Sequence, residues 1–118
     1  MLLWKKKPAI TRQDGWLKVG YQDTDVSVRL FGRLDRTLRD TIRGTLQSLL
    51  KLRGQGAIHL QMMDVFLLDP STAAGLVAFF RDAEQDDVRV EVRSASPAVK
   101  QVFKGLGVSD LLDNVNSI

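Results

Sequence analysis

The pattern of apolar and polar positions predicts a domain in which strands alternate with helices. Val26, Val28 and Leu30 alternate with polar residues, which is the period-two pattern of a strand with one buried face. An apolar stretch at 16–19 precedes this strand, and the polar residues 22–25 between the two are typical of a turn. Together these segments predict a hairpin near the start of the chain.

Three stretches with helical periodicity follow the hairpin. The first begins at Asp35 or Thr37, either of which suits a helix N-cap. The second runs from the cap Asp69 to about Ala83, and the third begins at the cap Ser96. In both of these a proline follows the cap directly, at the position where a helix tolerates it best. The apolar stripe of the first helix consists of Leu38, Ile42, Leu46, Leu49 and Leu50.

Extended segments separate these helices. Residues 57–63 read as a strand, and the apolar run 65–68 is typical of a strand buried on both faces. Residues 88–92 alternate again, and 109–112 read as a last short helix. An order in which strands and helices alternate predicts a mostly parallel sheet with an antiparallel hairpin at its start.

Length and charge indicate one domain with a basic arm. The chain has 118 residues, enough for one core, and we expect an arm at 1–14 and a single domain at 15–118. Residues 1–13 contain four basic residues and no acid, whereas the remaining chain carries 13 basic and 14 acidic residues. A nearly neutral domain lacks the basic face of a nucleic-acid reader, so we expect no nucleic-acid partner.

The basic arm has two interpretations. It is either an N-terminus without a role or a weak peripheral contact with an anionic lipid surface. Its apolar residues come first and its basic residues second, which is the reverse of a secretory signal. No run of about 18 apolar residues predicts a membrane span, so we expect a cytoplasmic protein. The residues available for a lipid contact are Leu2, Trp4, Lys5, Lys6 and Lys7.

Catalytic and metal-binding residue sets are scarce. The absence of cysteine excludes thiolate chemistry and Cys-ligated metals, and the single histidine excludes a two-histidine site. His59 lies in a strand pattern and reads as a structural histidine. Asp64 and Asp69 read as loop residues at the edges of a strand and a helix. We therefore expect no enzyme activity, no cofactor and no metal.

The segment around Asp69 carries the most informative chemistry. With Asp69 as N-cap, Ser71 and Thr72 take the second and third helical positions, at the positive end of the helix dipole. A phosphate on either hydroxyl would be electrostatically favourable there and would add nearly two negative charges. A helix start that is well capped and has no further role is the alternative interpretation.

Three segments in this order resemble the STAS domain, the sulphate transporter and anti-sigma factor antagonist family. Residues 28–35 (VRLFGRLD) resemble its strand-to-helix segment, 65–76 (VFLLDPSTAAGL) its switch segment, and 90–107 its last strand and following helix. The resemblance covers about residues 16–114. It implies an α/β fold with a small mixed sheet of four to five strands and three to four helices mainly on one face.

The resemblance also implies a function without catalysis. Anti-sigma factor antagonists of this family bind an anti-sigma factor that is also a serine kinase, and phosphorylation of the switch serine releases them. The implied protein is a partner-switching interaction module, monomeric or a weak homodimer. The implied partner-binding residues are Gly32, Asp35, Asp69, Pro70, Ser71, Thr72 and Gly75.

The sequence departs from the family pattern at the phosphorylated position. When Asp69 is matched to the family aspartate, Pro70 stands where the family has its acceptor serine. A register moved by one makes Ser71 the acceptor but places Asp69 one position too early, so the candidate acceptors are Ser71 and Thr72. If neither is phosphorylated, the domain either binds its partner constitutively or responds to a different signal. The alternative function is a cytosolic STAS subunit of a membrane transporter, such as a lipid-transport ABC complex, whose ATPase would be the partner.

Overall fold

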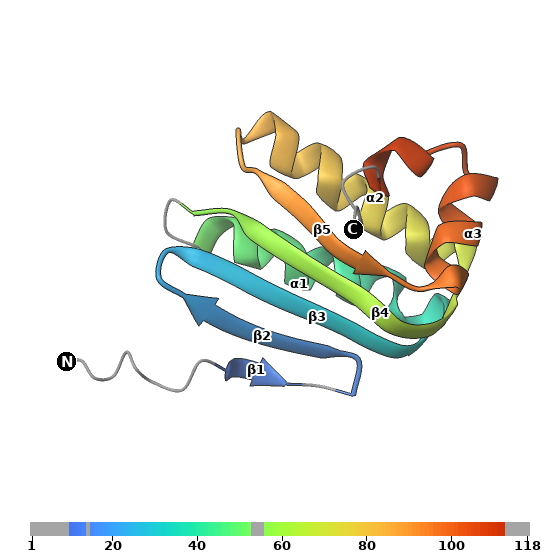
Figure 1. Ribbon diagram of the computed structural model, residues 1–118, viewed down its shortest axis with the longest axis horizontal. Helices are drawn as coiled ribbons and strands as arrows, with labels where there is room; N and C mark the ends of the chain where they lie inside the picture. Colours follow the sequence, from blue (N-terminus) through green and yellow to red (C-terminus); the bar gives the residue numbers. More distant parts are fainter. Residues whose placement is uncertain (1–9, 14, 53–55, 113–118) are drawn as a thin grey trace.

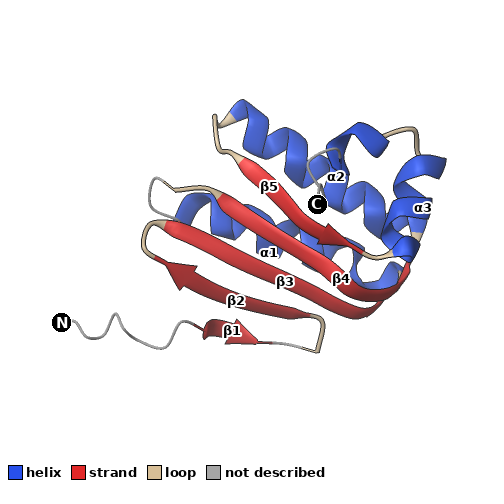
Figure 2. Cartoon of the chain, viewed as in Figure 1, coloured by secondary structure: helices blue, strands red, loops and turns tan. Residues whose placement is uncertain are grey.

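The computed structural model describes residues 10–13, 15–52 and 56–112. In this part of the chain, five strands form one sheet and three α-helices and two 3₁₀ helices connect or flank them (Figures 1 and 2). The elements are β1 (Ile10–Gln13), β2 (Leu17–Gln22), β3 (Asp25–Leu34), η2 (Arg36–Leu38), α1 (Arg39–Leu52), β4 (Ile58–Leu68), α2 (Pro70–Gln85), β5 (Val90–Ala95), α3 (Pro97–Gly105) and η3 (Ser109–Leu112).

The sheet is mixed, and its spatial order is the order of the sequence. β1, β2 and β3 are antiparallel neighbours, whereas β3, β4 and β5 are parallel. Figure 1 shows α1 and α2 side by side behind the sheet, with α3 beyond the carboxyl end of β4. The α/β class, the initial hairpin, the parallel strands and the placement of helices mainly on one face are therefore confirmed.

The core lies between this helical layer and one face of the sheet. Along β3, Val26, Val28 and Leu30 are fully buried while Ser27 and Arg29 between them are not, as the period of two predicts. Helix α2 contributes the fully buried Phe79, and α3 contributes Phe103. The predicted stripe of α1 supplies Ile42, Leu46, Leu49 and Leu50.

The strand β1 was not predicted, because it falls within the range assigned to the basic arm. It pairs with β2 antiparallel, with a register irregularity between Ile10 and Arg12. The arm residues 2–7, with their predicted lipid contact, lie outside the described residues. Within the described part of the chain, no helix has both the length and the apolarity needed to cross a membrane.

Strand β4 corrects two expectations. The run 65–68 is not buried on both faces, since Phe66 is 66% exposed; the helices cover only one face of the sheet. Asp64 is not a loop residue either. It lies inside β4, where its carboxylate forms an ion pair with Arg29 of β3.

Candidate functional site

Two aspartates meet where β3 and β4 end. Leu34 and Leu68 are paired in the parallel ladder, so Asp35 and Asp69, which directly follow them, leave the sheet at the same edge. The N–H of Asp69 donates to the carbonyl oxygen of Leu34 at 2.9 Å, which holds the two chain segments together. Each aspartate then begins a helix, so this edge presents two helix N-termini side by side.

Asp35 caps the 3₁₀ helix η2. Its backbone is extended, and Oδ1 accepts the N–H of Thr37 at 3.0 Å together with the Thr37 hydroxyl. Of the two predicted caps, Asp35 is therefore the acceptor and Thr37 is its donor. The cap satisfies one of the free N–H groups that every helix start leaves.

Asp69 caps α2 as the sequence predicts, with Pro70 as the first helical residue. Its Oδ2 accepts both the N–H of Ser71, at 2.9 Å, and the Ser71 hydroxyl. The hydroxyl bond is the main reason why the pKa of Asp69 lies below its ordinary value; the positive charge of Arg36 contributes less. The carboxylate is therefore held in its ionised form beside the Ser71 oxygen.

The two phosphorylation candidates differ in their surroundings. Thr72 is completely buried, and its Oγ1 donates to the carbonyl oxygen of Asp35 at 2.6 Å, which ties α2 to the start of η2. Ser71 is only half-buried. Its hydroxyl bonds only within its own capping turn, so it can be modified without separating the two segments.

The two glycines predicted to bind a partner do not form the surface of this edge, since Gly75 is buried in α2 and Gly32 lies within β3, two residues before its end. Gly75 is buried where α2 crosses α1, and a Cβ atom there would lie 3.0 Å from the carbonyl oxygen of Arg39. Gly32 has φ +85°, a conformation that L side chains rarely adopt, at a register irregularity between β3 and β4. The surface of the edge is formed by exposed Pro70 and by half-buried Asp35, Asp69 and Ser71.

Sequence reasoning missed the contribution of Arg36 to this edge. Arg36 is exposed in η2, and its charge favours the ionised form of Asp69. The two positions are 33 residues apart, and only the parallel pairing of β3 and β4 brings them together. A cap aspartate at the end of each of two consecutive parallel strands is the signal that could have suggested this neighbour.

A second polar cluster lies at the amino ends of the same strands. Arg93 Nε donates to His59 Nδ1 at 3.1 Å, so the other ring nitrogen of His59 carries the proton and donates to Asp25 at 2.8 Å. Arg93 also forms an ion pair with Glu91 at 3.1 Å. This confirms His59 as a structural histidine with satisfied hydrogen bonds.

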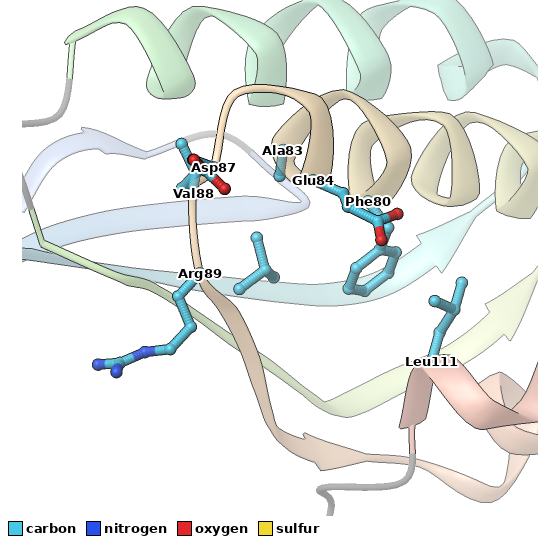
Figure 3. A pocket seen from close by; sticks show the side chains of 8 residues that line it. Phe80, Ala83, Glu84, Asp87, Val88, Arg89 and Leu111 are labelled. Carbon is cyan, nitrogen blue, oxygen red and sulfur yellow. The ribbon is translucent and has the colours of Figure 1, made fainter.

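A hollow beside the far end of α2 offers no comparable chemistry (Figure 3). Apolar side chains of Phe80, Val88 and Leu111 line it, with Glu84 and Arg89 among its charged residues. It lies at the opposite end of α2 from Asp69. The carboxyl edge of β3 and β4 is therefore the stronger candidate site.

A mixed sheet covered on one face, with a capped helix start directly after the inner strand β4, defines a STAS-type α/β domain. The model of the STAS_2 family, described as "Mlab, STAS domain", matches residues 17–113, so the chain belongs to this family. Among curated proteins, a sequence search finds no significant relative.

Two solved structures share this fold. One is the anti-sigma factor antagonist SpoIIAA in its unphosphorylated form, with a TM-score of 0.68 and 21% identity over 85% of each chain. The other is the Bacillus cell fate determinant SpoIIAA in its phosphorylated form, with a TM-score of 0.65 and 20% identity over 85% of this chain and 88% of that one.

Proposed function

We propose that this protein is a non-catalytic STAS interaction module that binds an anti-sigma factor with serine kinase activity, and that phosphorylation of Ser71 weakens the complex. The partner would dock on the edge formed by Asp35, Asp69, Pro70 and Ser71. The observation that carries the proposal is the half-buried Ser71 hydroxyl, which lies at this edge and bonds only to its own cap residue.

Electrostatics supports Ser71 as the switch. A phosphoryl group on Ser71 would replace the hydroxyl donor that now bonds Asp69 and would add nearly two negative charges beside that carboxylate. The start of α2 and Arg36 would accommodate part of this charge, but a partner would meet an anion where it now meets a neutral hydroxyl. SpoIIAA, which shares the fold, has been solved in both its unphosphorylated and phosphorylated forms.

The buried state of Thr72 argues against it as the acceptor. Phosphorylation of Thr72 would require its hydroxyl to leave the Asp35 carbonyl and reach the surface, which would open the contact between α2 and η2. A buried carbonyl that loses its donor is costly. We therefore assign the modification to Ser71 and a structural role to Thr72.

The proline at position 70 favours a second candidate function. It places no hydroxyl on the first residue of α2, the position that corresponds to the acceptor serine of the antagonists. An unmodified edge would bind its partner constitutively, as suits a cytosolic subunit of a membrane transporter such as a lipid-transport ABC complex. The partner would then be the transporter ATPase.

Phosphoserine incorporated at position 71 by genetic code expansion separates the two functions. The unmodified and phosphoserine proteins would each be titrated by calorimetry with a candidate anti-sigma kinase and, separately, with a candidate transporter ATPase. We expect the kinase to bind the unmodified chain and to lose about tenfold or more in affinity for the phosphoserine form, a change of roughly 1.4 kcal/mol.

Phosphate transfer provides the second measurement. Incubation with the kinase and ATP should phosphorylate the wild type and Thr72→Val, but not Ser71→Ala. Binding of the ATPase with no binding of the kinase would reject the switch in favour of the transporter subunit. Phosphate found on Thr72 would reject the assignment to Ser71.

A further inference from the structure

The uncovered face of the sheet presents apolar side chains on β4. Phe66 is 66% exposed and Met63 is 56% exposed. Within the described residues, four large apolar side chains are exposed, and the other two, Tyr21 and Leu106, lie on β2 and at the end of α3. Two of the four therefore lie within four consecutive residues of one central strand.

Two irregularities in the ladder between β3 and β4 place Phe66 in solvent. In a regular strand, position 66 would share the buried face with Ile58, Leu60 and Met62. The register shifts once between the pairs Arg29–Gln61 and Phe31–Asp64, which exchanges the two faces of β4.

The second irregularity restores the original pattern. Gly32 pairs with Val65 and Arg33 pairs with Leu67, so Phe66 lies between two paired residues and faces no partner in the ladder. Gly32, the partner of Val65 on β3, has a positive φ at this irregularity. Bulges of this kind redirect side chains, and here they expose an aromatic ring that the core would otherwise hold.

Basic side chains of β2 and β3 lie beside the exposed apolar residues of β4. Arg29 lies over the Phe31 ring, with its guanidinium carbon 5.7 Å from the ring centre, and forms an ion pair with Asp64. Lys18 is paired with Arg29 across β2 and β3, and Arg33 is exposed beside Leu67. We call this surface the Phe66 patch; it comprises Lys18, Arg29, Phe31, Arg33, Met63, Asp64 and Phe66.

The patch carries a net charge of +2, from three basic residues and one acid. Within the described residues, Lys18 and Arg33 have no ion-pair partner, so only Arg29 is neutralised. A row of basic groups beside exposed aromatic and methionine side chains is complementary to a segment that combines apolar and acidic residues.

We propose that the Phe66 patch docks an acidic protein segment whose apolar side chains cover Phe66 and Met63 and whose carboxylates pair with Lys18 and Arg33. The patch is continuous with the edge at Asp35 and Asp69, two residues after Arg33 and three after Phe66. The inference rests on the proposed function only in taking the partner to be a protein. It adds a second contact surface, which lies outside the Ser71 turn.

Charge disfavours two other occupants. A second copy of the chain would bring two patches of charge +2 face to face. Asp25 of β3 and Glu91 of β5 lie on the same face of the sheet as the patch. Their carboxylates would repel an anionic bilayer that lay flat against this face. An acidic protein segment can cover the patch alone.

A random 12-residue peptide library displayed on phage is the probe for this surface, with the full chain as target. The variants are Phe66→Ser, Arg33→Ser and, as a matched control, Leu106→Ser, which removes an exposed apolar side chain outside the patch. Thermal unfolding verifies that each variant folds. The dissociation constants of the enriched peptides are measured by fluorescence anisotropy.

We expect enriched peptides that contain more acids than bases together with apolar residues. Phe66→Ser should weaken their binding by about tenfold or more, as for an interface anchor, and Arg33→Ser by a smaller factor. Leu106→Ser should leave the affinity unchanged. These results hold or fail whether or not a kinase recognises Ser71.

Three results would overturn the proposal. The first is a library that yields no binders, or only binders that tolerate Phe66→Ser or lack an excess of acids. The second is Phe66-dependent binding to vesicles that contain phosphatidylglycerol, which would assign the patch to lipid. The third is a Phe66-dependent dimer in analytical ultracentrifugation, which would assign it to a second copy.

Discussion

The two ends of strands β3 and β4 use the same chemical device in different ways. At each end an aspartate accepts a backbone N–H and a side-chain donor, and its pKa lies below the ordinary value. At the carboxyl end the donors to Asp69 both belong to Ser71, two residues away. At the amino end the donors to Asp25 belong to His59 and Ala57, more than 30 residues away.

The two ends therefore differ in what their hydrogen bonds connect: neighbouring residues of one turn at the carboxyl end, and different strands at the amino end. The bonds between Ser71 and Asp69 lie within a single turn. A modification of Ser71 therefore leaves the pairing of the strands intact. Asp25, His59 and Arg93 instead connect β3, β4 and β5, and their bonds form only in one register. The amino end therefore holds the three strands in register, whereas the Ser71 bonds at the carboxyl end do not join strands.

The largest expected effect is at the amino end, from Gly56→Ala. A Cβ atom at this position would lie 2.2 Å from the carbonyl oxygen of Thr24 and 2.3 Å from Oδ1 of Asp25. Because backbone must move to make room, we expect a loss of about 3 kcal/mol in the free energy of unfolding. Urea unfolding followed by circular dichroism measures it, and a loss below 1 kcal/mol would show that the amino end is not rigid.

At the carboxyl end, Thr72→Val should cost less. Valine keeps the shape of the buried side chain but removes the donor to the Asp35 carbonyl, so we expect a loss of about 1–2 kcal/mol. The matched variant Ser71→Ala removes a half-buried hydroxyl and should cost less than Thr72→Val in the same urea titration. The reverse order would contradict the division of roles between the two hydroxyls.

Gly75→Ala tests whether the carboxyl end is as tightly packed as the amino end. The added Cβ would lie 3.0 Å from the Arg39 carbonyl, a smaller overlap than at Gly56, and alanine regains about 1 kcal/mol of helix propensity. We expect a net loss of about 1 kcal/mol, read from the shift in the urea midpoint. A loss of stability equal to that of Gly56→Ala would show that the two ends are equally tightly packed.

The smallest effect concerns acid. The pKa values of Asp25 and Asp69 are lowered from 3.8 in the folded chain, by the hydrogen bonds from His59 and Ser71 respectively. Their contribution to stability is present above the unfolded value and is lost as the pH falls through the folded value. The urea midpoint should therefore decrease below about pH 4, and less steeply in Asp25→Asn and Asp69→Asn.

These two asparagine variants also separate the ends. Asp25→Asn should additionally shift the imidazole resonances of His59 in NMR spectra, whereas Asp69→Asn should not. If the urea midpoint of both variants depends on pH as that of the wild type does, the hydrogen bonds to these two carboxylates do not contribute to stability.

Most of the fold followed from local pattern. Residues close to one another in the chain determine the period of two in β3, the apolar stripe of α1 and the capped starts of α2 and α3. The predicted caps Asp69 and Ser96 are the observed ones, and Pro70 and Pro97 begin their helices. β1 was missed because its four residues lie in the range assigned to the basic arm and carry no alternating pattern.

The features that depend on pairing between strands could not be read from the sequence. Four consecutive apolar residues at 65–68 look the same in a doubly buried strand and in a bulged strand, so the exposure of Phe66 was not foreseen. The bond from Thr72 to Asp35 and the proximity of Arg36 to Asp69 likewise arise only after β3 and β4 are aligned. The capping residues were therefore predictable, but the contacts that join the two strand ends were not.

The agreement between strand order and sequence order has a consequence for synthesis on the ribosome. Each new strand joins the sheet at an open edge, next to the strand made just before it, and none has to insert between two that are already paired. The hairpin of β2 and β3 can form early, and β4 and β5 can then be added in turn as α1 and α2 cover them. Among the described strands, the sheet can thus grow from one side, and β5 can join it after β4 without rearrangement.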